Sequence, residues 1–229
     1  MNKIFTLIAV ALVGYTPIKA QNVKLGVRAG VNISTLTNYN TSSIRFHNLK
    51  EVLETDEVTT GFKVGGAIGF FAEYHLSEKI AIEGGLAYSY HGASLKKNKY
   101  TSIDKTTGVI TNEENVNFDK GSHIAFNQLN LPTWLKYNLT PALQAKVGVS
   151  LGYLLSIKTK IDKESHNPKP INRLDVGLGI GGEYNFSSGL FIDTNFTLGL
   201  TELKVENSND YTSPSFESRI FQIGVGYKF

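Results

Sequence analysis

Serine and histidine residues lie close together at two places in the sequence, and such pairs could support nucleophilic chemistry. Ser89 lies two positions before His91, and Ser122 directly precedes His123. An imidazole can activate a serine hydroxyl when a third group orients the ring. Neither pair has an acidic residue at a defined spacing, so a lipid hydrolase is a less favoured alternative. The chain has no cysteine, which excludes a thiolate nucleophile, a thiolate metal site, a disulfide scaffold and a lipid-anchored cysteine.

Patterns for metal and nucleotide binding are weak. His91 and His123 bracket one long polar segment and could approach each other, but two histidines without further placed ligands do not define a metal site. Gly177, Gly179 and Gly182 form G-x-G-x-x-G, which binds dinucleotides only where a helix opens at the glycines. Here a strand-like alternation runs straight through the glycines. We therefore expect no catalytic residue, no metal and no cofactor.

The composition narrows the class of protein. The chain has 229 residues, of which 41% are hydrophobic and 19% charged, and a mean hydropathy of −0.12. These values fit neither a helical membrane protein nor a disordered chain. The formal net charge is +3, and two of the contributing lysines, Lys3 and Lys19, lie in the first twenty residues. The remainder has almost no charge excess, so we expect no nucleic-acid partner.

Residues 1–20 have the layout of a secretory signal peptide. Lys3 precedes a short apolar run over residues 4–13, and the segment ends on the small residue Ala20. The run is half the roughly 20 residues that a spanning helix needs. The sequence predicts cleavage between Ala20 and Gln21 and export from the cytoplasm.

The elements that must position any functional residue are strands. Beyond residue 20, apolar and polar residues alternate with period two, which indicates strands with two different faces. The eight alternating runs cover residues 23–33, 62–74, 80–91, 128–139, 144–155, 173–184, 190–200 and 221–229. An even number of antiparallel strands is typical of a closed barrel in a bilayer.

The connections between these runs alternate in length. Short turns are predicted at residues 77–79, 140–141 and 187–189, and long polar loops at residues 34–60, 92–123, 158–172 and 201–218. This segregation is typical of outer-membrane barrels, with the turns in the periplasm and the loops outside. We read the charge runs of the loops as solvated surface that could meet an unknown partner.

Two observations place the apolar face against lipid. The polar face is rich in glycine, which suits a narrow lumen that must hold long charged side chains. Four tyrosines lie on the apolar face near the short turns or the C-terminal end, where an aromatic girdle is expected. They are Tyr74, Tyr137, Tyr184 and Tyr227.

The polar face carries charges of both signs, and buried charges must be paired. We predict a lumenal network of Lys24, Arg28, Lys63, Glu73, Glu83, Lys136, Lys146, Arg173, Asp175, Glu183 and Asp193. A plug of salt bridges is favoured over a conducting pore because an eight-stranded barrel is only wide enough to be filled by side chains.

The chain resembles the PorT-like outer-membrane β-barrel proteins of Bacteroidota over residues 21–229. The matching segments include LNLPTWLKYNL (129–139), AKVGVSLGYLL (145–155), RLDVGLGIGGEYNF (173–186) and LFIDTNFTLGLTEL (190–203). The final FQIGVGYKF is similar to the assembly signal of such barrels. The resemblance implies that this signal consists of Phe221, Ile223, Val225, Tyr227 and Phe229.

These observations predict an all-β protein, with a signal peptide over residues 1–20 and an eight-stranded antiparallel transmembrane β-barrel over residues 21–229. We expect a non-enzymatic protein of the outer membrane of a Gram-negative bacterium that exposes long loops for interaction. Its expected partners are outer-membrane lipid and lipopolysaccharide, the barrel-assembly machinery and an unknown loop partner. A small pore or transporter and a component of a protein secretion apparatus are the alternatives.

Overall fold

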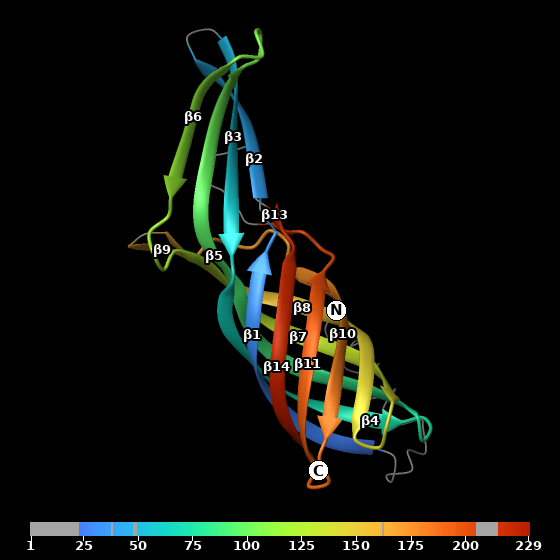
Figure 1. The fold of residues 1–229 in the computed structure, drawn as a ribbon. Coiled ribbons are helices and arrows are strands. Elements are labelled where there is room, and N and C mark those ends of the chain that lie inside the picture. The colour runs from blue at the N-terminus through green and yellow to red at the C-terminus, as the bar shows by residue number, and fades with distance from the viewer. Residues whose placement is uncertain (1–22, 38, 48–49, 162, 205–214) are drawn as a thin grey trace, which may run out of the picture.

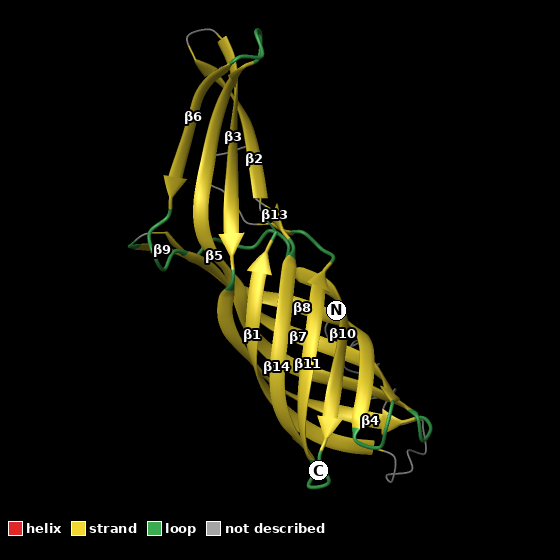
Figure 2. Ribbon diagram, viewed as in Figure 1, coloured by secondary structure: helices red, strands yellow, loops and turns green. Residues whose placement is uncertain are grey.

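The computed structural model describes residues 23–37, 39–47, 50–161, 163–204 and 215–229 (Figure 1). These residues form antiparallel strands joined by turns and loops (Figure 2). No helix in the described ranges is long and apolar enough to cross a membrane. The predicted signal peptide, with its cleavage site at Ala20 and Gln21, lies outside the described residues.

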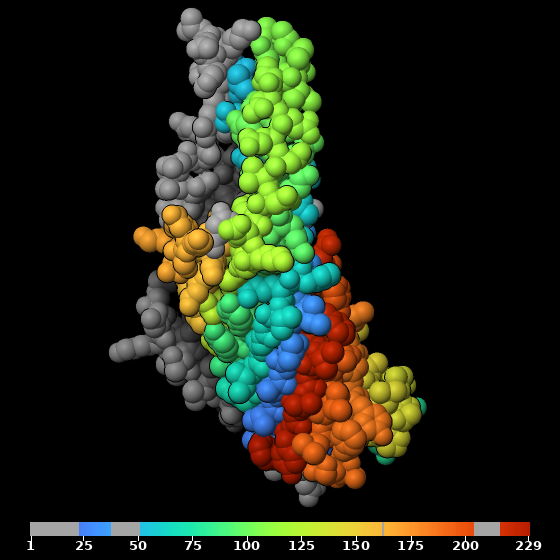
Figure 3. Space-filling view, turned by 60° about the vertical axis from the view of Figure 1, so that its left-hand side comes forward, coloured from blue at the N-terminus to red at the C-terminus, as the bar shows by residue number. Residues whose placement is uncertain are grey.

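Eight strands form a closed ring. β1 pairs with β4 on one side and with β14 on the other, so the first and last strands of the ring meet. Figure 3 shows blue β1 lying against red β14. The strands of the ring, in order, are β1(Val23–Leu36), β4(Lys63–His75), β5(Ile80–Asp104), β7(His123–Asn138), β8(Leu143–Ile161), β10(Leu174–Asn185), β11(Leu190–Gly199) and β14(Ser218–Lys228). The predicted eight-stranded barrel is confirmed.

The apolar face of the barrel points outward. Adjacent residues of β4 illustrate the alternation, because the Phe70 side chain is 60% exposed and Phe71 is 4% exposed. A water-soluble barrel would bury the face that carries Phe70. An exposed apolar band around an otherwise polar lumen is the arrangement that lipid requires.

Three tight turns close one end of the barrel. At the β4–β5 turn, Ser77 Oγ accepts hydrogen bonds from the backbone N–H groups of Lys79 and Ile80. Thr140 Oγ1 plays the same part at the β7–β8 turn. Gly189 has φ +88° at the β10–β11 turn, where glycine avoids a steric cost. The predicted short turns therefore lie together at one end of the barrel.

The other end differs from the sequence prediction. Residues 34–60 and 92–123 were expected to be loops, but they contain β2(Tyr39–His47), β3(Lys50–Gly61), the outer half of β5 and β6(Ile110–Asn117). These strands form a sheet with the order β2-β3-β5-β6 that rises beyond the barrel (Figure 1). We call this sheet the extension. Most of its described residues are polar or partly exposed, so its strands could not be predicted from an alternation of hydrophobicity.

The other two predicted loops also contain strands. β8 continues to Ile161 and pairs with β9(Glu164–His166), within the predicted loop 158–172. β12(Leu203–Lys204) pairs with β13(Ser215–Phe216), within the predicted loop 201–218. All four predicted loops therefore carry backbone pairing.

An apolar core fills the outer end of the barrel. It contains the buried side chains of Leu36, Val58, Ala93, Leu95, Ile124, Phe126, Leu154, Ile157, Leu203 and Phe216. Leu203 and Phe216 belong to the β12–β13 pair, so the connection between β11 and β14 contributes to this core. The rings of Phe126 and Phe216 lie 6.5 Å apart. Apolar packing thus covers the lumen where the extension begins.

Candidate functional site

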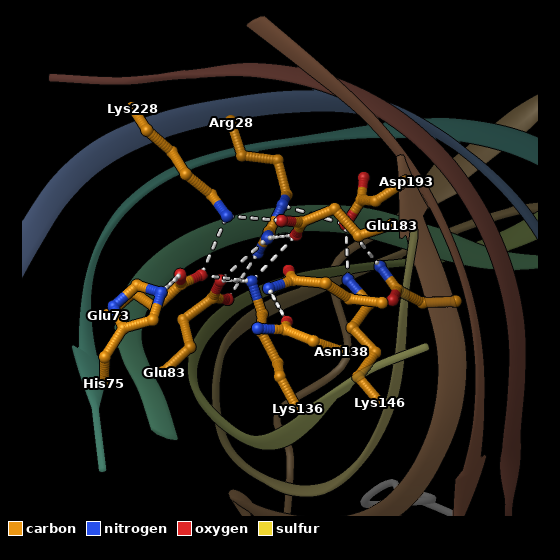
Figure 4. A network of polar contacts seen from close by, with 12 residues as sticks. Arg28, Glu73, His75, Glu83, Lys136, Asn138, Lys146, Glu183, Asp193 and Lys228 are labelled. Atoms are coloured by element: carbon orange, nitrogen blue, oxygen red, sulfur yellow. Dashed lines mark hydrogen bonds and ion pairs between the residues drawn. The ribbon is translucent and has the colours of Figure 1, made fainter. Parts of the chain in front are cut away.

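Eight charged side chains meet inside the turn end of the barrel, and each strand of the ring contributes one (Figure 4). We call this group the charge ring. In strand order its members are Arg28, Glu73, Glu83, Lys136, Lys146, Glu183, Asp193 and Lys228. Four positive and four negative groups balance, as burial of charge requires.

Two cations bridge most of the carboxylates. Lys136 Nζ lies 2.7 Å from Glu73, 2.6 Å from Glu83 and 2.8 Å from Glu183. The guanidinium of Arg28 donates two hydrogen bonds to Glu83, at 2.8 and 3.1 Å. It also contacts Glu183 at 3.3 Å and Asp193 at 2.9 Å. The planar guanidinium suits this position because its fork matches a carboxylate and leaves further donors for other partners.

The remaining cations complete the charge ring from neighbouring strands. Lys146 Nζ lies 2.6 Å from Asp193. Lys228 Nζ lies 2.9 Å from Glu73 and 2.6 Å from Glu183. Each carboxylate of the ring therefore meets at least one cation.

The charges around the barrel are arranged in pairs of like sign. Glu73 lies directly opposite Glu83 across β4 and β5, and Lys136 lies opposite Lys146 across β7 and β8. Glu183 likewise lies opposite Asp193 across β10 and β11. Like charges in such positions repel each other within a hairpin. They are compensated by charges of other hairpins, as Glu83 is by Lys136 and Arg28, so hairpins of opposite sign need one another.

Two aromatic rings line the same space. Phe71 and Phe191 lie 5.7 Å apart, and the guanidinium carbon of Arg28 lies 4.8 and 5.2 Å from their centroids. A Cβ added at Gly26 would overlap the Phe71 ring, and one added at Gly226 would overlap the Phe191 ring. The lumenal glycines therefore make room for large side chains, as the sequence predicts.

Four of the residues predicted for the network lie outside the charge ring. Lys24 is exposed although its backbone is opposite Glu73. Lys63 lies at the outer end of β4, with its Nζ 4.6 Å from the Tyr90 ring centroid. Arg173 is also exposed, and its guanidinium donates to the carbonyl oxygen of Leu154.

Asp175 is buried, but it lies higher in the lumen than the charge ring. It accepts hydrogen bonds from Gln128 at 3.1 Å and Thr201 at 3.0 Å. Lys228 belongs to the charge ring but was not among the residues predicted for the network. The alternation of the last strand places Lys228 on the polar face, and this position is what could have indicated that Lys228 belongs to the network.

A small cavity of about 90 Å³ lies between the charge ring and the apolar core, and both polar and apolar residues line it. Its lining includes Asn32, Gln128, Asp175, Asn195 and Gln222. The amide nitrogen of Asn32 donates to the carbonyl oxygens of Gly66 and Tyr90, while its buried Oδ1 has no hydrogen-bond partner among the described residues. Such a space suits ordered water.

The serine and histidine pairs do not form a catalytic arrangement. His91 is buried, with Nδ1 3.3 Å from Ser89 Oγ and its ring 5.7 Å from that of Phe126. Its Nε2 has no hydrogen-bond partner in the part of the chain that the structure describes, so no carboxylate there orients the ring. His123 pairs in register with Ser94, away from the lumen. Across the described ranges, no three His, Asp or Glu side chains gather as metal ligands would.

The predicted girdle and the last strand lie on the lipid face. Near the turn end, Tyr74, Tyr137, Tyr184 and Tyr227 are 40%, 46%, 48% and 39% exposed. The predicted assembly-signal residues share the outer face of the last strand and its end, namely Phe221, Ile223, Val225, Tyr227 and Phe229. The G-x-G-x-x-G glycines lie within β10, with no helix after them.

Several solved membrane barrels resemble this chain at low identity. Neisserial surface protein A is 12% identical with a TM-score of 0.46, over 90% of this chain and 97% of that chain. OprG from Pseudomonas aeruginosa is 12% identical with a TM-score of 0.46, over 91% and 96%. Ail of Yersinia pestis is 11% identical with a TM-score of 0.43, over 91% and 99%. No curated protein matches the sequence.

A family model settles the assignment. The model described as "Outer membrane protein beta-barrel domain" matches residues 19–205, which is most of the chain and all of the ring up to β11. The closed ring, the outward apolar face and the charge-filled lumen agree with that description. The chain belongs to the outer membrane protein beta-barrel domain family and is an outer-membrane protein.

Proposed function

We propose that this protein is a closed, non-enzymatic anchor that holds the extension outside the outer membrane for contact with a partner. The observation that carries the proposal is the obstruction of the lumen at two heights. The charge ring fills the turn end with side chains such as Lys136, Glu83 and Glu183, which are 0% exposed. The apolar core fills the outer end, where Phe126 and Leu154 are 0% exposed.

A conductance measurement tests the closed state. Purified protein inserted into planar bilayers is expected to give no current steps above the bilayer background, because ions would have to cross both the charge ring and the apolar core. A porin added to the same bilayer controls for insertion and detection. Regular current steps from the protein would overturn the proposal in favour of a small pore or transporter.

The extension supports the interaction role. β2, β3, the outer half of β5 and β6 form a sheet that does not take part in closing the barrel. Lys99 and Glu113 pair across β5 and β6 at 2.9 Å, and this contact raises the pKa of Lys99. Paired backbone and cross-strand contacts give a partner an ordered surface to meet.

A co-purification experiment tests that role and the alternative of a secretion apparatus. The resemblance to PorT-like proteins of Bacteroidota supports this alternative. Tagged protein, cross-linked in native membranes, is compared with a variant in which residues 39–59 are replaced by a short turn. We expect envelope proteins that co-purify with the whole chain and are lost with the variant. Equal recovery from both forms would contradict an interaction through the extension.

Export and insertion belong to the same proposal. The layout of residues 1–20 supports cleavage of a signal peptide, and the outer face of β14 supports recognition by the barrel-assembly machinery. Amino-terminal sequencing of the protein from outer membranes is expected to begin at Gln21. A protein that begins at Met1 would contradict the cleavage.

A further inference from the structure

We propose that a basic pocket on the outside of the barrel, just above the lipid band, binds the phosphate groups of a glycolipid in the outer leaflet. The pocket encloses about 390 Å³ where β5 passes from the barrel into the extension. Lys63, Lys96, Lys120 and His123 bring basic groups to its lining, and Asp119 brings an acidic group. This inference does not depend on whether the lumen conducts or the extension has a partner.

The pocket opens on the outer face of the sheet. Leu95 and Ile124 point inward, because both belong to the apolar core. Strand alternation then directs the neighbouring side chains of Ser94, Lys96 and His123 outward. Lys63 alternates with outward-facing Val64 and so begins on the lumenal side of β4, but its long side chain brings Nζ to 4.6 Å from the ring of Tyr90, the neighbour of inward-facing His91.

The height of the pocket corresponds to the edge of the membrane. Val64 and Tyr74 both face outward on β4 and are separated by about 34 Å along the strand, at about 3.4 Å per residue. A strand tilt of about 40° reduces this length to about 26 Å of height, which matches the apolar band of about 25 Å in such barrels. Lys63 follows Val64 at the outer boundary of this band, and Phe62, which is 74% exposed, lies beside it there.

The lysines of the pocket are free to meet an anion. Neither Lys96 nor Lys120 forms an ion pair with any residue in the described part of the chain. Gly61 makes room for Lys96, since a Cβ at Gly61 would overlap the Lys96 side chain and approach Ser94 Oγ to 2.7 Å. The pocket therefore presents three ammonium groups against the one carboxylate of Asp119.

The imidazole of His123 adds a directed group. Its Nδ1 lies 2.7 Å from the carbonyl oxygen of Gly121 and donates to it, so Nε2 is the ring nitrogen left for a ligand. Ammonium groups bind phosphate oxygens as compact point charges. At this height the anions that a membrane supplies are the phosphates of outer-leaflet glycolipids such as lipopolysaccharide. Position and charge thus favour a lipid headgroup.

Native mass spectrometry of the full protein, released from lipid nanodiscs, tests this site. The probes are phosphorylated lipid A, dephosphorylated lipid A and inorganic phosphate. The test variant is K63Q/K96Q/K120Q, and K105Q/K163Q/K169Q removes the same charge from exposed lysines on the outer side that do not line the pocket. A heat-induced shift in gel mobility confirms that each variant forms the barrel.

We expect the wild type to retain about tenfold more phosphorylated lipid A than dephosphorylated lipid A, because the ammonium groups bind the phosphate oxygens. The test variant is expected to lose this preference, and the control variant to keep it. Equal loss in both variants would show that overall charge is responsible and would overturn the site. Displacement of the lipid by millimolar inorganic phosphate would show a site for free anions and overturn the assignment to a headgroup.

Discussion

At the scale of single residues, Lys136 is the centre of the charge ring. Its Nζ contacts three carboxylates within 2.8 Å, and its side chain is 0% exposed. A buried ion pair adds little when formed, but loss of one partner leaves the other charges uncompensated. Removal of one charge should therefore lower the stability of the barrel more than removal of one charge together with a charge of opposite sign that it contacts.

Lys136→Met is expected to lower the free energy of unfolding by about 3–5 kcal/mol, because Glu73, Glu83 and Glu183 lose their shared cation. Urea unfolding in lipid vesicles measures this change through the fluorescence of the single tryptophan, Trp134, which is 5% exposed. K136M/E83Q should recover part of the loss. A K136M variant as stable as the wild type would contradict the role of the charge ring.

Lumenal space is limited in the same region. Gly226→Ala places a Cβ against the Phe191 ring and the Val27 backbone, so we expect a loss of about 1–3 kcal/mol from overpacking. The matched control is Gly84→Ala, because a Cβ at Gly84 meets nothing within 4 Å. The same urea titration compares the two variants. Similar losses of stability in both variants would show that the close packing around Phe191 does not contribute to the stability of the barrel.

Among the elements, the tight turns lie at one end of the barrel and the extension lies at the other. β5 belongs to both the barrel and the extension, since its first half pairs with β4 and its outer half pairs with β3 and β6. Gly92, with φ +151°, lies between these halves, and a Cβ there would overlap the backbone of Ile124. A glycine is thus required where β5 leaves the barrel.

Limited proteolysis of intact cells tests the orientation of these ends. Trypsin is expected to cleave after Lys105, in the exposed turn between β5 and β6, and to spare Lys79 in the β4–β5 turn. Both residues are exposed in the protein, so only the membrane distinguishes them. Cleavage at Lys79 in intact cells would place the turns outside and invert the topology.

At the scale of the whole molecule, the sign of the charges couples the hairpins. Pairs of like charge follow one another around the barrel, with Glu73 and Glu83 followed by Lys136 and Lys146. A hairpin with two like charges is unfavourable alone and is compensated by hairpins of opposite sign. We infer that the charge ring favours the closed ring over open sheets.

Exchanging the signs of two hairpins tests that inference. The variant E73K/E83K/K136E/K146E keeps the net charge but places four positive residues together, followed by four negative ones. We expect it to lose the closed form that resists sodium dodecyl sulfate without heating. The control R28K/K228R preserves the sign of the charge on every strand and should keep the change in gel mobility that heating causes in a closed barrel. The same change in mobility in both variants would show that charge order does not direct closure.

The strands of the barrel and their two faces could be predicted from the order of the residues alone. Period-two alternation is a local property, so runs such as residues 62–74 and 144–155 predict β4 and the lower part of β8 without any knowledge of their neighbours. The same alternation located the lipid face, the girdle tyrosines and the short turns. The extension was not predicted because β3, β6 and the outer half of β5 carry polar residues on both faces, so hydrophobicity does not alternate along them.

Which charges meet in the lumen could not be predicted from the order of the residues. The period-two alternation places Lys24, Arg173 and Lys228 on the polar face, but it does not give the height of each side chain along the lumen. Strand tilt and stagger set that height, and they bring Lys228 to Glu73 and Glu183 while leaving Lys24 and Arg173 exposed. Contacts across a closed barrel depend on the register of all eight strands together, and no single strand contains that information.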